Sequence, residues 1–221
     1  MAALTWDDAG KHLYEVGVDH GVLYLPDTMG AYTGGVAWNG LTTVTEKPAG
    51  AAANPHYADN IKYINIISAE TFEAQIDAFT YPDKFAECDG SYEPTPGVAV
   101  GQQARKVFGL SYRTLVGNDL EGQEHGYKLH LVYGCQAAPS QKAYATVNDN
   151  PAPIAFSWNV TTTPVNVSGQ KPTSLIVIDS TLVDATKLAS LEDELYGTGT
   201  STDATLPLPD DVITLLQTTG P

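Results

Sequence analysis

Alternation of apolar and polar residues with a period of two is the clearest pattern in the chain. One such segment runs from Thr71 to Phe79. Its apolar positions are Phe72, Ala74, Ile76 and Ala78, and its polar positions are Thr71, Glu73, Gln75 and Asp77. Because successive side chains of a β-strand point to opposite faces, this pattern predicts a strand with one buried face and one wet face.

A second segment with the same period runs from Ile154 to Thr163 and stops at Pro164. Its apolar positions are Ile154, Phe156, Trp158 and Val160, and its polar positions are Ala155, Ser157, Asn159 and Thr161. Proline cannot donate to a strand ladder, so it is a natural end for the segment. We therefore expect a second two-faced strand here.

Aromatic and β-branched runs separated by Gly, Pro and Asn fill much of the first three-quarters of the chain, which is typical of short strands joined by turns. We expect a strand pair within His12–Leu25, turning around Asp19-His20-Gly21. We also expect a hairpin within Gly34–Lys47, because Asn-Gly in Trp38-Asn39-Gly40 is a strong hairpin signal.

Two further strands are expected from Lys106 to Val116 and from Tyr127 to Tyr133. The polar, Gly-rich stretch Gly117–Gly126 between them is interpreted as a long hairpin loop. Ser174–Ile178 is a short apolar run, which is typical of a central strand.

The period changes to three or four residues near the C-terminal end. The apolar positions there are Ala185, Leu188, Leu191 and Leu195. Asp184 is placed to cap the start of a helix, and Gly197 follows its end. A short helix capped by an aspartate is expected over Asp210–Gln217, and a single helical turn over Tyr81–Cys88.

These elements predict a mainly β fold with one flanking α-helix. The 221 residues, of which 43% are hydrophobic, suit one globular domain over residues 1–221. An N-terminal arm (about residues 1–11) and a C-terminal tail (about 198–221) would extend from it. The small-residue stretch Gly197–Thr205 would be a linker.

The charge balance argues against tight binding of nucleic acid. Lys and Arg total 11 against 26 Asp and Glu, a formal net charge of −15, so the surface repels phosphate. No apolar run approaches the roughly 18 residues of a membrane span, and Met1–Gly10 does not resemble a signal peptide. We expect a protein made and folded in a cytoplasm, with no membrane insertion, and with Cys88 and Cys135 as free thiols.

Common catalytic and metal-binding motifs are not found in the sequence. His125 and His130 would lie on opposite faces of one strand, which disfavours joint metal ligation. Asn148-Asp149-Asn150-Pro151 lacks the Gly and Glu of an EF-hand and favours a turn over a calcium site. Glu192-Asp193-Glu194 fans out around a helix, as on a solvated face. We expect no enzyme activity and no cofactor.

Four basic residues gather around one predicted hairpin. They are Arg105, Lys106, Arg113 and Lys128. Two interpretations compete, a weak contact with phosphate and ion pairs with an acidic neighbouring surface. The large acidic excess favours ion pairs.

Several stretches spread over most of the chain carry a family resemblance. They are Tyr57–Tyr63 (YADNIKY), Tyr81–Gly90 (YPDKFAECDG), Phe108–Arg113 (FGLSYR), Lys142–Asn148 (KAYATVN), Trp158 with Val160–Val165 (VTTTPV), and Leu191–Gly197 (LEDELYG). With these, the sequence resembles the major tail proteins, or tail tube proteins, of long non-contractile-tailed bacteriophages that infect Gram-positive bacteria.

The resemblance implies a β-sandwich with a flanking helix, assembled into hexameric rings that stack into a tube similar to those of contractile tails and type VI secretion systems. It implies a virion location, DNA passing through without adhering, and the tape measure, tail terminator and distal tail proteins as partners. Two-faced strands suit the wall of such a tube. Single-chain barrels with a water-filled channel need about 16 to 18 strands, so several copies would share it.

An acidic channel would repel DNA phosphates, and six copies at −15 each carry a formal charge of −90 per ring. The candidate channel-lining residues are Glu73, Gln75, Asp77, Ser157, Asn159 and Thr161. The alternative is that these polar residues belong to the outer surface. Candidate contacts between rings or subunits are Arg105, Lys106, Arg113, Asp119, Glu121 and Glu124, with the loops Ala49–Asn54 and Gly117–Gly126, the arm and the tail.

A second class of function is an acidic carbohydrate-binding or adhesin-type module. Trp6, Trp38 and Trp158 could supply a platform on which a sugar stacks. Trp158, however, alternates with apolar residues, which favours a place in the core. A hydrolase is a third class, but no paired-carboxylate constellation supports it.

Overall fold

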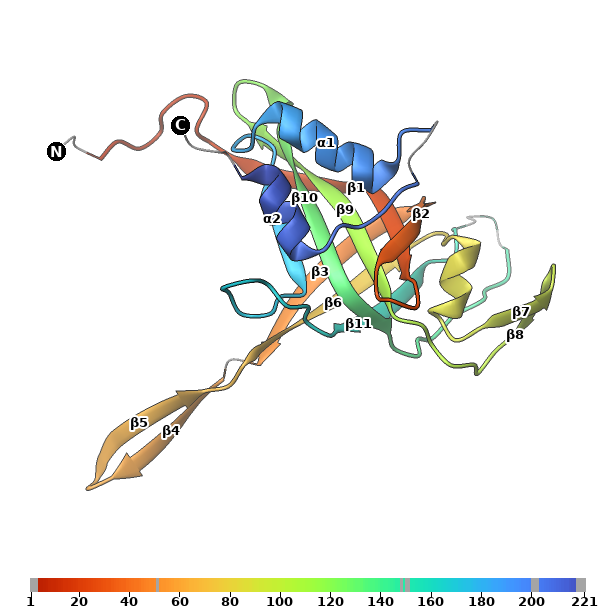
Figure 1. Cartoon of the computed structure of the whole chain (residues 1–221), viewed down its shortest axis with the longest axis horizontal. Helices are drawn as coiled ribbons and strands as arrows, with labels where there is room; N and C mark the ends of the chain where they lie inside the picture. Colours follow the sequence, from red (N-terminus) through yellow and green to blue (C-terminus); the bar gives the residue numbers. More distant parts are fainter. Residues whose placement is uncertain (1–3, 51, 148, 150–151, 200–202, 218–221) are drawn as a thin grey trace.

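One large antiparallel sheet curls around most of the molecule (Figure 1). The computed structural model describes residues 4–50, 52–147, 149, 152–199 and 203–217. The strands of the large sheet are β1 (Tyr14–Pro26), β2 (Tyr32–Trp38), β3 (Leu41–Gly50), β6 (Glu70–Ala78), β9 (Phe108–Asn118), β10 (Gly122–Ala137), β11 (Phe156–Thr162) and β12 (Leu175–Asp179). The mainly β fold class is confirmed.

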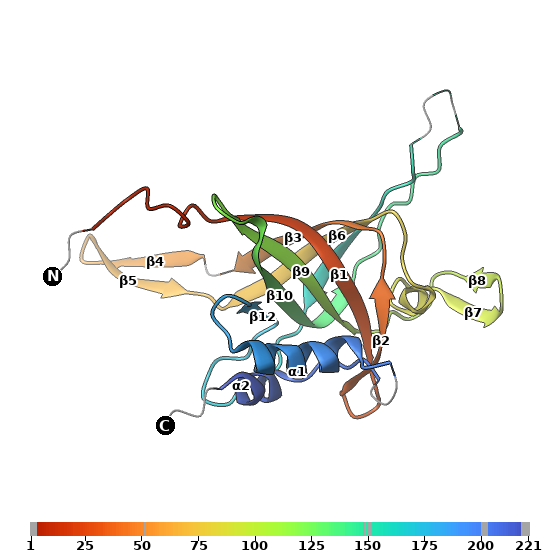
Figure 2. The same cartoon turned by 90° about the horizontal axis from the view of Figure 1, so that it is seen from above.

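Two small hairpins and the helices complete the fold. The hairpins are formed by β4 (Ala53–Ala58) with β5 (Ile61–Ile67) and by β7 (Tyr92–Thr95) with β8 (Val98–Val100). The helices are α1 (Ala185–Tyr196), α2 (Pro209–Leu216) and a 3-10 helix, η1 (Asp83–Glu87). Figure 2 shows α1 and α2 side by side against one face of the sheet, and β4–β5 at the opposite end of the molecule from β7–β8.

The strand order is β2-β1-β9-β10-β11-β6-β3, with β12 paired to β10 beside this path. Although β2 and β3 are the two ends of the sheet, they follow one another in the chain through Asn39 and Gly40. The ends therefore lie close together, and Leu41 of β3 packs directly on Gly21 of β1. The result is a sheet folded onto itself as a partial barrel.

An aromatic core fills the space inside the curled sheet. Its central members are Trp38, Phe85 and Trp158, with ring centroids 4.5 Å apart for Trp38 and Phe85 and 5.0 Å apart for Phe85 and Trp158. The buried carboxylate of Asp89 accepts a hydrogen bond from Trp158 Nε1 (3.2 Å) and pairs with Arg105 at 3.4 Å. These contacts hold η1 against the sheet.

A second core lies between the sheet and the two helices. The helices contribute Leu188, Leu191, Leu195 and Val212, and the sheet contributes mainly Val22, Tyr24, Leu129, Leu131, Tyr133 and Ile178. The buried parts of these strands, Val22–Tyr24 of β1 and Leu129–Cys135 of β10, thus contribute to both cores and are covered on both faces. Burial on both faces explains their nearly continuous apolar runs.

Strand β10 changes partners at Gly134. Lys128–Val132 pair with β12, whereas Cys135–Ala137 pair with β11. Gly134 has a φ of +61°, and a Cβ there would lie 2.2 Å from the carbonyl oxygen of Thr163. Only glycine allows both the turn of the backbone and this close approach.

Several expected elements are confirmed. The two-faced strands are β6 and β11, and the helical turn within Tyr81–Cys88 is η1. Helix α1 has Asp184 as its N-cap, accepting hydrogen bonds from the backbone of Thr186 and Lys187, and ends at Gly197. The terminal helix is also present as α2, but its N-cap is Leu208, with Pro209 in the first turn, instead of an aspartate.

The expected strand pair in His12–Leu25 is wrong, because β1 runs through it as one strand. Gly17 and His20 have positive φ angles (74° and 50°) and form irregularities in the ladder to β9. The turn at Asn39-Gly40 is correct, but β2 pairs with β1 and β3 with β6, so they form no hairpin. Turn signals read along the sequence do not reveal which strands pair.

Three other expectations also need correction. The loop over Gly117–Gly126 is short, because β9 extends to Asn118 and β10 starts at Gly122. Strand β12 is not central, since among the described residues it pairs only with β10. The stretch Ala49–Asn54 belongs largely to the ends of β3 and β4.

Parts of some expectations lie outside the described residues. They are residues 1–3 of the arm, residue 51 of the stretch 49–54, residues 148, 150 and 151 of the Asn-rich turn, residues 200–202 of the linker, and residues 218–221 of the tail.

The replacement Gly134→Ala tests the partner change of β10. We expect a loss of about 2–5 kcal/mol in the free energy of unfolding, because a left-handed backbone and a steric clash add together. The matched control is Gly169→Ala, where φ is also positive (+73°) but no atom lies within 4 Å of the added Cβ. Its cost should be about 1–2 kcal/mol. Equal losses in urea unfolding would show that the contact with Thr163 is unimportant.

Candidate functional site: the polar sheet face and the apolar hairpins

The outer face of β3, β6 and β11 is a continuous polar surface. Glu73, Gln75 and Asp77 of β6 lie directly opposite Thr161, Asn159 and Ser157 of β11. On the other side of β6, the same residues lie opposite Lys47, Thr45 and Thr43 of β3. The structure thus brings together all the residues that we expected as a channel lining. The contribution of β3 was missed, although Thr43, Thr45 and Lys47 alternate with Val44 and Glu46 in the sequence.

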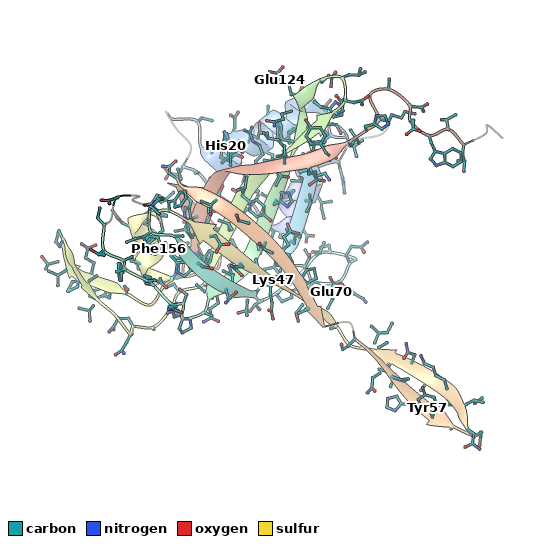
Figure 3. All side chains as sticks on the ribbon, turned by 180° about the vertical axis from the view of Figure 1, so that it is seen from behind. His20, Lys47, Tyr57, Glu70, Glu124 and Phe156 are labelled. Atoms are coloured by element: carbon teal, nitrogen blue, oxygen red, sulfur yellow. The ribbon has the colours of Figure 1, made fainter. Side chains whose placement is uncertain are left out.

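Hydrogen bonds link the side chains of this polar sheet face across the strands. Gln75 is at their centre: its Oε1 accepts from Lys47 Nζ (2.6 Å), and its Nε2 donates to Asp77 Oδ1 (3.1 Å) and Ser157 Oγ (3.1 Å). Two carboxylates and one ammonium group give this surface a slight negative charge. The strong acidity of the whole chain is therefore not concentrated here. Figure 3 shows Lys47 on this sheet, near the foot of the β4–β5 hairpin.

Behind the polar sheet face, Glu46 of β3 connects this strand to β9 and β10. Its Oε1 accepts a hydrogen bond from the hydroxyl of Tyr112 (2.6 Å) and lies 2.9 Å from His130 Nδ1. The other ring nitrogen of His130 lies 3.0 Å from the hydroxyl of Thr114. The hydrogen bonds from His130 and Tyr112 outweigh burial and lower the pKa of Glu46 below its usual value of 4.5. This cluster holds the last strand of the sheet against its middle strands.

The basic residues expected at interfaces form ion pairs within the chain. Arg113 makes two hydrogen bonds of 2.8 Å to Asp19, which lower the pKa of that carboxyl. Arg105 pairs with Asp89, Lys106 with Glu87, and Lys128 with Glu15. Of the two interpretations, contact with phosphate and ion pairing with acidic groups, the structure favours ion pairing. The acidic partners belong to the same chain. A role between subunits stays a prediction.

The acidic residues of the β9–β10 turn have different surroundings. Asp119 accepts a hydrogen bond from the backbone N–H of Gly10 (2.9 Å), which lowers its pKa, and it also contacts His12 at 3.3 Å. Glu121 pairs with His125 at 2.5 Å. Glu124 is exposed at the outer end of the turn (Figure 3). Asp119 therefore attaches the N-terminal arm to the body of its own chain.

The β4–β5 hairpin projects from the sheet and makes no packed contact with it. Every described residue from 52 to 70 is exposed. Its large apolar side chains are Tyr57, Ile61, Tyr63, Ile64, Ile66 and Ile67, each 50–72% exposed. A bulge interrupts the alternation of β5 near Tyr63, so the pairing with β4 places Ile61, Ile64 and Ile66 on one face and Tyr57 and Ile67 on the other. A two-stranded hairpin is marginally stable alone, and apolar residues on both faces indicate that other surfaces cover both.

Apolar side chains are also exposed at the opposite end of the molecule. The β7–β8 hairpin carries Tyr92 (59% exposed), Val98 (51%) and Val100 (44%). The segment between β10 and β11 carries two further exposed apolar side chains, Tyr144 and Val147, which are 75% and 84% exposed. Figures 1 and 2 both place β4–β5 and β7–β8 at the two ends of the long axis. Exposed apolar side chains therefore occur at both ends of the molecule. We call the end with β4–β5 and the end with β7–β8 its two poles, and this arrangement bipolar.

The described residues offer little support for a sugar-binding platform, a metal site or a membrane-spanning helix. Trp38 and Trp158 are buried in the aromatic core, so they form no sugar-stacking platform, and Trp6 alone is exposed. No cluster of three His, Cys, Asp or Glu residues suited to a metal ion occurs in the described part of the chain. Within that part, each helix falls short of the length and apolarity needed to cross a bilayer. Cys88 and Cys135 are free and buried, as expected.

No protein-family model matches the chain, and no curated protein matches it in sequence. The function is therefore inferred from the polar sheet face and the two apolar poles.

The replacement Glu46→Gln tests the link between β3 and the middle of the sheet. Because the folded-state pKa of Glu46 is lowered, its carboxylate stabilises the fold above pH 4.5, and this contribution disappears as the pH falls through the folded-state pKa. We expect wild type to exceed the variant by about 1–2 kcal/mol near pH 6. The difference should shrink below about pH 4.

Urea unfolding followed at several pH values measures this difference. Glu73→Gln on the polar sheet face is the matched control, since the Glu73 side chain has no hydrogen-bond or ion-pair partner among the described residues. It should change stability by less than about 0.5 kcal/mol. A difference for Glu46→Gln that is independent of pH would contradict the assignment.

Proposed function

We propose that this protein is a structural subunit of a phage tail tube, which assembles into hexameric rings that stack into a conduit for DNA during ejection. The observation that carries the proposal is the β4–β5 hairpin. Its isoleucine and tyrosine side chains are exposed on both faces, and no described part of its own chain covers them. An apolar element of this kind indicates a protein that completes its structure by association.

The bipolar arrangement supports an open-ended assembly. The apolar surfaces at the two poles differ, so a contact that joins one pole to the opposite pole of the next copy is head-to-tail. Head-to-tail contacts do not close between two copies and generate rings or filaments. This is the type of contact that a stack of rings needs along its axis.

The polar sheet face supports the conduit. It is broad, covered by short polar side chains, and linked by hydrogen bonds among its own residues. Its only basic side chain, Lys47, donates to Gln75. Such a surface offers DNA phosphates little positive charge to bind, which suits rapid passage. One chain supplies three strands to this surface, so a closed channel needs several copies.

The double replacement Ile64→Lys with Ile66→Lys tests the role of the hairpin. We expect wild type to form hollow tubes or stacked six-fold rings at rising concentration, and the variant to stay monomeric. Two charges on one face would have to be desolvated in any contact. Negative-stain electron microscopy and light scattering measure the difference.

Leu182→Lys is the matched control, because Leu182 is 84% exposed on the body of the protein, away from the hairpin. This variant should assemble like wild type. Wild-type protein that stays monomeric at every concentration, or a hairpin variant that assembles normally, would contradict the proposal.

Charge reversal by Asp77→Lys tests the channel lining. We expect tubes of this variant to retain short duplex DNA at about 50 mM salt, whereas wild-type tubes do not, because each ring gains a circle of lysines. Co-sedimentation of DNA with the tubes measures retention. Glu124→Lys makes the same charge change at the β9–β10 turn and should leave retention unchanged. Equal retention by both variants would place the polar sheet face on the outside of the tube.

A further inference from the structure

A groove lies at the foot of the β4–β5 hairpin. Its volume is about 740 Å³, and it lies between the beginning of β6 and the segment that leads into β12. Its apolar lining includes Ile67, Phe72, Pro164 and Leu175. Figure 3 shows Glu70 at this foot, with the hairpin extending away from it. The groove therefore belongs to the same pole as the exposed hairpin.

One polar atom in this groove lacks a partner. Ser174 is 4% exposed and lines the groove, and its hydroxyl makes no hydrogen bond with any described residue. A buried hydroxyl without a partner costs about 1–3 kcal/mol. Its neighbour Thr173 is satisfied, since its hydroxyl donates to the carbonyl of Leu175. The Ser174 oxygen itself is closed off from solvent, so it lies beneath the wall of the groove and not on its surface.

The charge at this pole is unusual for so acidic a chain. Lys171 lines the groove, Lys62 lies on β5 and Lys47 at the end of β3. None of the three has a carboxylate within ion-pair distance in the described part of the chain, whereas Lys106, Lys128 and Lys142 are all paired. The carboxylates of Glu46 and Glu70 also line the groove, but Glu46 is already engaged by Tyr112 and His130, so Lys171 is the charged group of the lining that can take an acidic partner.

The opposite pole has a segment with matching properties. The β7–β8 hairpin presents Tyr92, Val98 and Val100 to solvent and carries the exposed carboxylate of Glu93. That carboxylate contacts only the backbone N–H of Gly97 among the described residues. As an isolated pair of strands, the hairpin also has free backbone groups along its outer edges. It is a narrow, apolar element with one negative charge.

We propose that the groove at the foot of β4–β5 receives the β7–β8 hairpin of a second copy in the next ring. This contact rests on the tube proposed above. The valines and Tyr92 of the incoming hairpin cover Phe72 and Leu175. Its Glu93 pairs with Lys171. Because groove and hairpin lie at opposite ends of one chain, the contact repeats along the tube without closing.

Disulfide trapping tests the contact in assembled tubes. In the variant Glu70→Cys with Val98→Cys, one thiol lies at the rim of the groove and the other on β8. The native thiols do not interfere, since both are buried and burial raises the pKa of Cys88 to about 12. Oxidation should give a ladder of covalent dimers, trimers and longer chains on a denaturing gel. The single variants, and Leu182→Cys with Val98→Cys, should give no ladder.

Charge exchange provides a second test that needs no added thiol. Lys171→Glu and Glu93→Lys should each raise the protein concentration needed for tubes by about tenfold, because a weak ion pair is lost at every subunit of a ring. Combining the two replacements should restore assembly to within about threefold of wild type. Failure of the combined variant to recover, with each single variant impaired, would overturn the pairing.

The outcomes separate the two proposals. Tubes that form without a ladder, or with a ladder only for the Leu182→Cys pair, overturn the docking of β7–β8 and leave the tube proposal in place. A ladder specific to the Glu70→Cys pair supports both. Wild-type protein that forms neither rings nor tubes overturns the tube proposal and the docking with it.

Discussion

The change of partners along β10 is the constraint on which the rest of the structure depends. At Gly134 the strand leaves β12 and joins β11, and the backbone there touches the carbonyl of Thr163. Because of this change, one continuous sheet folds onto itself and encloses the aromatic core, while its other side receives α1 and α2. The same change places β6 and β11 over this core with their apolar residues inward. Their alternate, polar residues therefore point outward and form the polar sheet face.

The stable body and the exposed hairpins have different roles. In the body, charged groups at buried or half-buried positions have partners in the same chain, as in Arg113 with Asp19 and Asp89 with Trp158. The hairpins β4–β5 and β7–β8, by contrast, expose most of their large apolar side chains. A single chain gains no free energy from burying these apolar side chains. That free energy becomes available only when another surface covers the hairpins on association. This division is consistent with the assembly proposed above.

The candidate surfaces were only partly predictable. Glu73, Gln75 and Asp77 alternate with apolar residues, so their common face follows from a local period. The β4–β5 hairpin was missed because its apolar residues occur on both faces and give no alternation, although Asp59 and Asn60, both with positive φ, are typical of a tight hairpin turn. The ion pair of Arg113 joins residues 94 positions apart, and no local pattern specifies such a partner.

The sequence by itself determined the mainly β class, the two-faced strands β6 and β11, and helix α1 with its cap at Asp184. Each depends on side chains within a few residues of one another, so a local period or a capping residue is enough. Only the tertiary structure decided that β2 and β3 pair with different strands, that Glu46 reaches His130, and that the two apolar hairpins lie at opposite poles. These features arise from packing between distant segments, where the fit of whole surfaces, and not the neighbouring residues, selects the partner.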